Sequence, residues 1–155
     1  MTQEEFQKFK DSFEKDYKNI GQIKCPYFNE DITFNAKGLE HLKFLRKNHA
    51  RITDEQIIRI RLFPLVPEIL KLTRTIQGIT HTKHFEVVRT NQRNEIIALP
   101  VVYYEFIAII KDKRVRVIIK QIYNGPKFFW SVIPFWKVDK NSGRRRMSYG
   151  NPETD

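Results

Sequence analysis

The hydrophobic residues of this chain change their spacing near Gly78, from a helical period before it to a strand period after it. Over residues 2–19, aromatic residues recur at intervals of three and four, a spacing that predicts an amphipathic helix. They are Phe6, Phe9, Phe13 and Tyr17. Four Lys and five acidic residues fall within residues 1–20, so we expect the other side of this helix to face solvent.

Three further helices are predicted before Gly78. Asn35 suits the N-cap of a helix over residues 36–50. Its apolar side is marked by Leu39, Leu42, Leu45 and His49. Thr53, followed by Gln56, matches a capping box and predicts the start of a third helix. Pro67 suits the first turn of a short fourth helix.

Four predicted strands follow, because the second half of the chain is rich in β-branched and aromatic residues. Their sequences are HFEVVRT, VVYYEFIAIIKD, KRVRVIIKQIYN and KFFWSVIPFWKV. The short connections KDK and NGP predict hairpins. We therefore expect an α+β fold with the N-terminal helices packed on one face of an antiparallel sheet of about four strands. The expected organisation is a helix over residues 1–20, one domain over 21–140 and a basic, mobile tail over 141–155.

The chain is strongly basic, with a formal net charge of +10 and a pI near 9.8. Such a charge favours a polyanionic partner through counterion release. No apolar run reaches the roughly 18 to 20 residues that span a bilayer, so no membrane partner is expected. The N-terminus has no signal-peptide pattern, and Cys25 is the single cysteine. Both observations favour a reducing, cytoplasmic compartment.

Several side chains could carry chemistry. On the third strand, Arg116 and Lys120 point to the same side, and a basic pair on the open face of the sheet can bind phosphate. His41 lies beside the apolar side of its helix, a placement that suits a general acid or base near pH 7. The alternatives are that both cations are ordinary exposed strand residues and that His41 is a surface histidine. His49, on the apolar side of the helix, is expected to be a packed core residue.

Metal and cofactor motifs are missing. His81 and His84 have no acidic or cysteine partner at ligand spacing, and the chain has no HExxH, GxGxxG, P-loop or GxSxG pattern. No cofactor is therefore expected. What remains is a metal-free set of His, Lys, Arg and hydroxyl groups. That set suits RNA cleavage, in which the 2′-OH of the substrate attacks the adjacent phosphate and no protein nucleophile is needed.

The stretches FNAKGLEHLKFLRKNH, IIRIRLFPLVPEIL and VRVIIKQIYNGPKFFWSVIP occur in this order within the part of the chain, residues 22–137, that the following resemblance covers. This order resembles the phage-associated barnase–EndoU–colicin E5/D–RelE-like nucleases. The resemblance implies a metal-independent ribonuclease toxin that produces 2′,3′-cyclic phosphate ends and is neutralised by an acidic antitoxin or immunity protein. It implies roles for His41 as the helix histidine, Arg116 and Lys120 as strand cations, and Ser131 as the hydroxyl of the last strand.

RNA contacts are expected outside this set as well. Trp130 or Tyr123 can stack a base, and the basic run Arg144, Arg145 and Arg146 can contact phosphates. The RNA target, tRNA or mRNA, stays open. Two other classes of function fit the same residues: a non-catalytic nucleic-acid-binding module, and a protein-interaction subunit whose basic face meets an acidic partner.

Overall fold

The computed structural model describes residues 1–46, 48–135 and 150–155. Its helices are α1 (Gln3–Ile20), α2 (Ala36–Lys43), α3 (Thr53–Leu62), the short 3-10 helix η1 (Phe63–Leu65) and α4 (Val66–Leu72). Its strands are β1 (Gln22–Cys25), β2 (Glu30–Thr33), β3 (Phe44–Arg46), β4 (His49–Ala50), β5 (Gly78–Thr90), β6 (Arg93–Ile110), β7 (Lys113–Ile122) and β8 (Lys127–Pro134). None of the helices in these ranges is long and apolar enough to cross a membrane.

The fold is α+β, with a larger sheet than the sequence predicted. Six of the described strands form one sheet in the order β1-β2-β8-β7-β6-β5. The expectation of about four strands is therefore wrong. The two additional strands, β1 and β2, are four residues each, too short to give a periodic signal. The sheet is also mixed, because β2 runs parallel to β8 where Thr33 pairs with Phe128.

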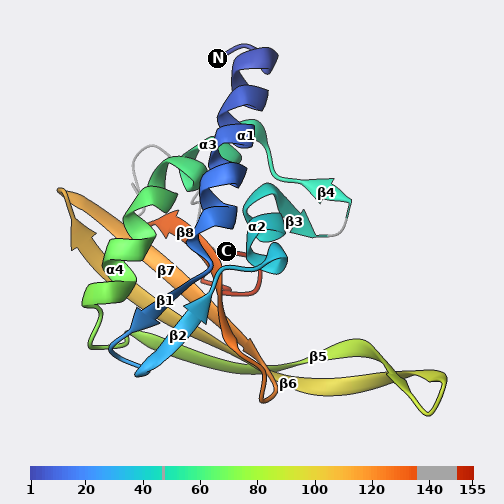
Figure 1. The fold of residues 1–155 in the computed structure, drawn as a ribbon. Coiled ribbons are helices and arrows are strands. Elements are labelled where there is room, and N and C mark those ends of the chain that lie inside the picture. The colour runs from blue at the N-terminus through green and yellow to red at the C-terminus, as the bar shows by residue number, and fades with distance from the viewer. Residues whose placement is uncertain (47, 136–149) are drawn as a thin grey trace.

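The helices cover one face of this sheet, as predicted (Figure 1). On β7, Val115, Val117 and Ile119 point toward them and join the main core. The helices contribute Phe13, Tyr17, Leu39, Leu42, Ile60, Leu62, Val66, Ile69 and Leu70 to the same core. The opposite face carries a smaller apolar cluster around Val101, Tyr103 and Ile118. The second face is therefore the one on which polar side chains can gather.

The helix caps differ from the sequence prediction. The capping box lies at α1, where Thr2 and Glu5 exchange side-chain hydrogen bonds with each other's main-chain N–H. The capping box expected at Thr53 is wrong, because Ile52 is the N-cap of α3 and makes no side-chain cap. Gln56 instead donates to the main-chain oxygen of Arg51 at 2.6 Å. This bond ties the start of α3 to the chain that leads into it.

The second helix is shorter than expected. It ends at Lys43, and the chain continues as the small β3–β4 ladder, turning at Asn48 with a φ of 62°. The spacing of leucines is compatible with a longer helix, but the side chain of Arg51 bonds the main-chain oxygen of His41 at 2.9 Å and closes the C-terminal end of α2. His49 is consequently exposed on β4, and its expected place in the core is wrong.

The two long hairpins after β5 meet the prediction. Lys111 and Asp112 turn between β6 and β7 with φ values of 49° and 63°, the conformation of a tight hairpin turn. Between β7 and β8 the ladder shifts at Ile118, which opposes Ser131, while its neighbour Ile119 opposes Phe129. This β-bulge at Trp130 places Phe129 in the helix-covered core and Ser131 on the opposite face. In a strand without the bulge, side chains alternate strictly, and these two would have lain on one face.

Candidate anion-binding site

A group of polar side chains is buried on the second face of the sheet, beside β8. Arg116 and Lys120 reach it from β7, and Trp130 and Ser131 from β8. Helices α2 and α3 pack against β8 and bring in His41 and Arg59, and the connection between β4 and α3 brings in Arg51. The face was expected to be open, but Arg116 and Lys120 are only 4% and 6% exposed. These seven residues are called the candidate site below.

Three guanidinium groups dominate the candidate site, and Arg51, Arg59 and Arg116 are named the arginine cluster. Arg116 forms an ion pair with Glu105 across the β6–β7 ladder. Arg51 and Arg59 each lie 4.0 Å from the Glu55 carboxylate. Two carboxylates from the sheet and α3 therefore face three buried guanidinium groups. Arginine presents five fixed N–H donors, so the cluster offers more donors than these partners accept.

The remaining acceptors come from the residues Gly150–Asp155, called the 150–155 segment (Figure 1). The Asp155 carboxylate accepts from Arg116 at 2.6 Å, and its main-chain oxygen accepts from Arg59 at 2.9 Å and from Ser131 at 2.7 Å. The main-chain oxygen of Thr154 accepts from Arg51 at 2.9 Å. Asp155 is 1% exposed. A mobile tail was expected over 141–155, but this end of it is packed into the candidate site.

His41 is held in one orientation. Its imidazole ring is stacked on Trp130, with ring centroids 3.8 Å apart. Its Nε2 lies 3.0 Å from an Nη atom of Arg51, and because a guanidinium only donates, this nitrogen accepts and the proton sits on Nδ1. Burial and the nearby charges of Arg51, Arg59 and Lys120 lower the pKa of His41 to about 2. His41 is therefore neutral at physiological pH.

Trp130 is enclosed on both faces. Lys120 places its ammonium 3.9 Å from the centroid of the indole ring, within the range of a cation–π contact. Because His41 is equally close to the same centroid, the two residues occupy opposite faces. The indole N–H donates to the main-chain oxygen of Pro152 at 3.1 Å. A base could stack on Trp130 only if one of these neighbours moved.

Gly38 lets α2 approach β8 closely enough to bring His41 over Trp130. A Cβ atom at this position would lie 2.2 Å from the main-chain oxygen of Phe129 and 2.7 Å from the hydroxyl of Tyr17. No side chain fits there. Asn35 caps the same helix by accepting from the N–H of Gly38 at 3.2 Å, so the start of α2 is fixed against the strand that carries Trp130.

The arginine cluster is strongly desolvated and has donors that its partners do not fill. Burial lowers the pKa of Arg51 and, together with the neighbouring charge of Arg51, lowers the pKa of Arg59 to about 9. Within the described part of the chain, the Nε and Nη1 groups of Arg59 have no hydrogen-bond acceptor. Buried donors without acceptors are costly. The candidate site therefore has the chemistry of a receptor for an anion with several oxygen atoms, such as a phosphate.

The sequence named four of these seven residues in catalytic roles, and the structure places them together: His41, Arg116, Lys120 and Ser131. Trp130 was named for base stacking and lies among them. Tyr123 is 59% exposed in the β7–β8 turn, and no contact of the described residues joins it to the candidate site. Arg144, Arg145 and Arg146 lie outside the described residues.

Arg51 and Arg59 were missed by the sequence analysis. Arg51 precedes a helix and has no pattern that marks it. Arg59 could have been found, because Gln56, Arg59 and Phe63 follow the helical spacing of three and four that also positions buried Ile60. Polar residues at core-facing positions of a helix are a signal for a buried polar site.

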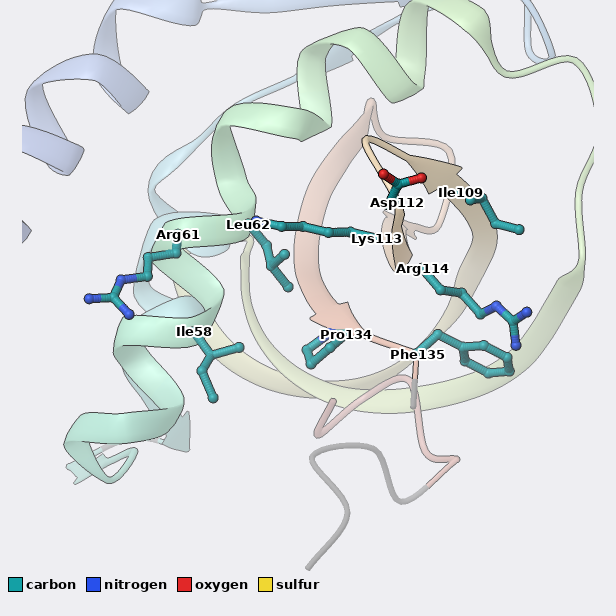
Figure 2. Close-up of a pocket in the computed structure, with 9 residues that line it drawn as sticks. All are labelled: Ile58, Arg61, Leu62, Ile109, Asp112, Lys113, Arg114, Pro134 and Phe135. Atoms are coloured by element: carbon teal, nitrogen blue, oxygen red, sulfur yellow. The ribbon is translucent and has the colours of Figure 1, made fainter. Parts of the chain in front are cut away.

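Other candidate sites are weaker. No group of three or more His, Cys, Asp or Glu residues that could hold a metal is found among residues 1–46, 48–135 and 150–155. A cavity of about 740 Å³ opens between α3 and the β6–β7 turn, lined by Ile58, Arg61, Leu62, Ile109, Asp112, Lys113, Arg114, Pro134 and Phe135 (Figure 2). None of these residues belongs to the candidate site. Phe135 adjoins residues 136–149, which lie outside the description, so this cavity is not assigned a ligand.

Comparison of the chain with protein-family models, with curated proteins and with solved structures gives no match.

Proposed function

We propose that the protein is a metal-independent endoribonuclease that cleaves RNA by attack of the 2′-OH on the adjacent phosphate, and that it acts as a toxin. The observation that carries the proposal is the arginine cluster. Three buried guanidinium groups and the Ser131 hydroxyl converge on carboxylate and main-chain oxygens of the 150–155 segment. A phosphodiester presents oxygens of the same kind, and the chain is basic enough to attract RNA.

In the proposed reaction the scissile phosphate takes the position of the carboxylate and the main-chain oxygen of Asp155. Arg59 and Arg116 then hold its non-bridging oxygens, and Ser131 donates a third hydrogen bond. The pentavalent transition state carries one more negative charge than the substrate, and fixed guanidinium groups in a water-poor site stabilise that charge more than the ground state. This electrostatic contribution needs no metal and no covalent intermediate.

His41 is the proposed proton acceptor for the 2′-OH. It is neutral, so it can accept the proton of the 2′-OH. As the 2′-oxygen bonds to phosphorus, the bond from phosphorus to the 5′-oxygen breaks, and the imidazolium so formed returns the proton to that oxygen, which leaves as a 5′-hydroxyl. The His41 pKa of about 2 reflects burial among cations, and the extra negative charge of the transition state, which the displaced carboxylate does not supply, raises this pKa as the reaction proceeds. Arg51 holds Nε2 of His41 and has to release it when the base acts. Lys120 packs against Trp130 and keeps that ring beneath the imidazole.

The proposal is tested by incubating the purified protein with total tRNA and with a single-stranded RNA in the presence of EDTA. We expect cleavage that leaves 2′,3′-cyclic phosphate ends. A substrate with 2′-deoxyribose at the cleaved position should stay intact because it lacks the nucleophile. Absence of cleavage under these conditions, with RNA bound by the same preparation, would overturn the nuclease proposal.

A second candidate is a non-catalytic nucleic-acid-binding module. The observation that favours it is the state of His41, whose low pKa and engaged Nε2 limit proton transfer. The arginine cluster would then bind phosphate without cutting. Bound but intact RNA in the same assay would support this candidate.

A further inference from the structure

We infer that the 150–155 segment is a built-in competitor of phosphate ligands, which fills the phosphate position of the candidate site and has to leave before RNA enters. The identity of the displacing ligand as RNA rests on the proposed function. The occupancy of an anion site by the chain itself rests only on the contacts described above. Four features of the segment carry this inference.

The first feature is that its contacts are those a phosphate would make. The segment accepts hydrogen bonds from all three members of the arginine cluster, from the Ser131 hydroxyl and from the indole N–H of Trp130. Every one of these bonds is to an oxygen of the segment. The side chains that bind it are therefore the same ones that an RNA phosphate would need.

The second feature is that the segment adds little to the apolar core. None of its residues belongs to either buried hydrophobic cluster. Pro152 is buried, but Gly150, Asn151 and Glu153 are exposed. Charge-assisted hydrogen bonds hold the segment rather than apolar burial. A ligand whose oxygens accept stronger hydrogen bonds from the same donors can replace the segment without disturbing the packing of the sheet.

The third feature is the change of charge on release. The segment brings one carboxylate into the candidate site, that of Asp155 at Arg116, and places a second beside it, that of Glu153, which lies 3.3 Å from His84. Without them, four cations remain in the candidate site against the two carboxylates of Glu55 and Glu105. The opened site is therefore positively charged, as a receptor for a phosphodiester has to be.

The fourth feature is that the segment is a short turn with few bonds of its own. Within it, the N–H groups of Thr154 and Asp155 donate to the main-chain oxygen of Asn151 at 3.2 and 2.9 Å. These two amides give a direct measure of whether the segment is closed. When the segment leaves, this short turn loses the contacts with the site that hold it in shape, so its internal bonds open more often and both amides exchange with solvent faster.

The test uses the full chain and two ligands that do not depend on cleavage, cytidine 3′-phosphate and a 2′-deoxy oligonucleotide. Each ligand should accelerate hydrogen exchange at the Thr154 and Asp155 amides and leave the Val117 amide in β7 unchanged. Asp155→Asn removes the carboxylate from Arg116 and should tighten binding of cytidine 3′-phosphate about tenfold, the value of one charge-assisted hydrogen bond. Glu95→Gln, an exposed acid on β6, is the matched control and should leave the affinity unchanged.

Glu153→Gln is the second variant, because its side chain is 51% exposed and its loss cannot unfold the protein. It should tighten binding in the same direction by a smaller factor. If neither variant tightens binding and the two amides keep their protection with ligand bound, the inference is overturned. If Asp155→Asn cuts RNA more slowly with unchanged affinity, Asp155 belongs to the catalytic machinery and the inference is again overturned, while the nuclease proposal stands.

Failure of the nuclease proposal alone gives a different set of results. If ligands release the segment and Asp155→Asn binds more tightly, but no preparation cuts RNA, the competitor role stands and the nuclease proposal fails. When both proposals hold, Asp155→Asn should cut faster than the wild-type protein at RNA concentrations below saturation.

Discussion

The imidazole ring of His41 lies nearly parallel to the indole ring of Trp130, with an interplanar angle of 16° and centroids 3.8 Å apart. The two residues come from α2 and from a bulge in β8, so their contact joins the helical layer to the sheet at the candidate site. The stacking fixes the plane of the imidazole, and Arg51 fixes its tautomer. The predictions below start from this pair.

His41→Ala should lower the rate of RNA cleavage by about 10² to 10⁴, the usual contribution of a general base. The reason is that no other imidazole among the described residues lies in the candidate site. The measurement is the initial rate in EDTA with a single-stranded RNA. His49→Ala, which removes an exposed histidine on β4, should cut at the wild-type rate. Normal turnover by His41→Ala would contradict the assigned role.

Folding stability should fall as the pH is lowered below about 6.5. The pKa of His41 is about 2 in the folded protein, against an ordinary value of 6.5. Between these two values the unfolded chain binds a proton that the folded protein does not, so acid favours unfolding. The full contribution is present above pH 6.5, and the loss is on the order of 1 kcal/mol per pH unit below it. Urea unfolding at pH 7 and pH 5 measures it.

The control for this pH dependence is a pair of histidine variants. His41→Gln should flatten the difference between pH 7 and pH 5, because the buried titrating group is gone. His49→Gln should keep the wild-type difference. If the wild-type protein and both variants lose the same free energy of unfolding between pH 7 and pH 5, His41 does not cause that loss.

Gly38→Ala should destabilise the fold by about 1 to 3 kcal/mol, the usual cost of overpacking. The added methyl group would collide with the main-chain oxygen of Phe129, which cannot rotate away. Helix α2 would have to move from β8 and take His41 off Trp130. Chemical denaturation reports the first effect, and tryptophan fluorescence, measured in a Trp136→Phe background so that only Trp130 emits, reports the second. Glu40→Ala, at an exposed position of the same helix, should show neither.

Arg59→Met should weaken binding of cytidine 3′-phosphate by roughly tenfold or more, because a buried guanidinium donates a charge-assisted hydrogen bond to the bound anion. The slope of log affinity for single-stranded RNA against log salt should also fall by about 0.7, the value of one phosphate contact. Arg61→Met changes an exposed arginine two residues along the same helix. An equal effect of both variants would place the phosphate elsewhere.

Replacing Arg144, Arg145 and Arg146 together by Gln should weaken RNA binding and reduce its salt dependence, while the rate at saturating RNA stays unchanged. The reason is that a basic run contributes to affinity through counterion release and carries no reacting group. Binding isotherms at several salt concentrations measure the slope. An unchanged slope would show that this run does not contact RNA.

The elements that sequence patterns predict well here are those with strong local signals. The aromatic spacing predicts α1, and turn residues predict the hairpins of β6, β7 and β8. The short strands β1 and β2 were missed because four residues cannot show a period. The end of α2 was missed for another reason: the side chain of Arg51, eight residues beyond Lys43, closes it, and such a tertiary contact leaves no local signal.

In the candidate site too, some features were predicted from the sequence and others were not. His41, Arg116 and Lys120 were found from their residue types and their positions on a helix and a strand, Ser131 was named through the family resemblance, and the four do lie together. Their burial was not predicted, because the cover comes from Asp155 and its neighbours at the far end of the sequence. The bulge at Trp130 was also invisible, since it depends on how β8 registers with β7.

The side of β8 that faces away from β7 pairs with β2 only at Phe128 among the described strands. Helices α2 and α3 lie against the rest of this edge. An uncovered edge is a template for strand addition by another molecule. The helices that bring His41 and Arg59 to their positions therefore also shield this edge of β8 from strand addition. A substitution that moves α2 away from β8 should lower the solubility of the protein as well as its activity. The solubility of a variant therefore indicates whether α2 still holds His41 in position.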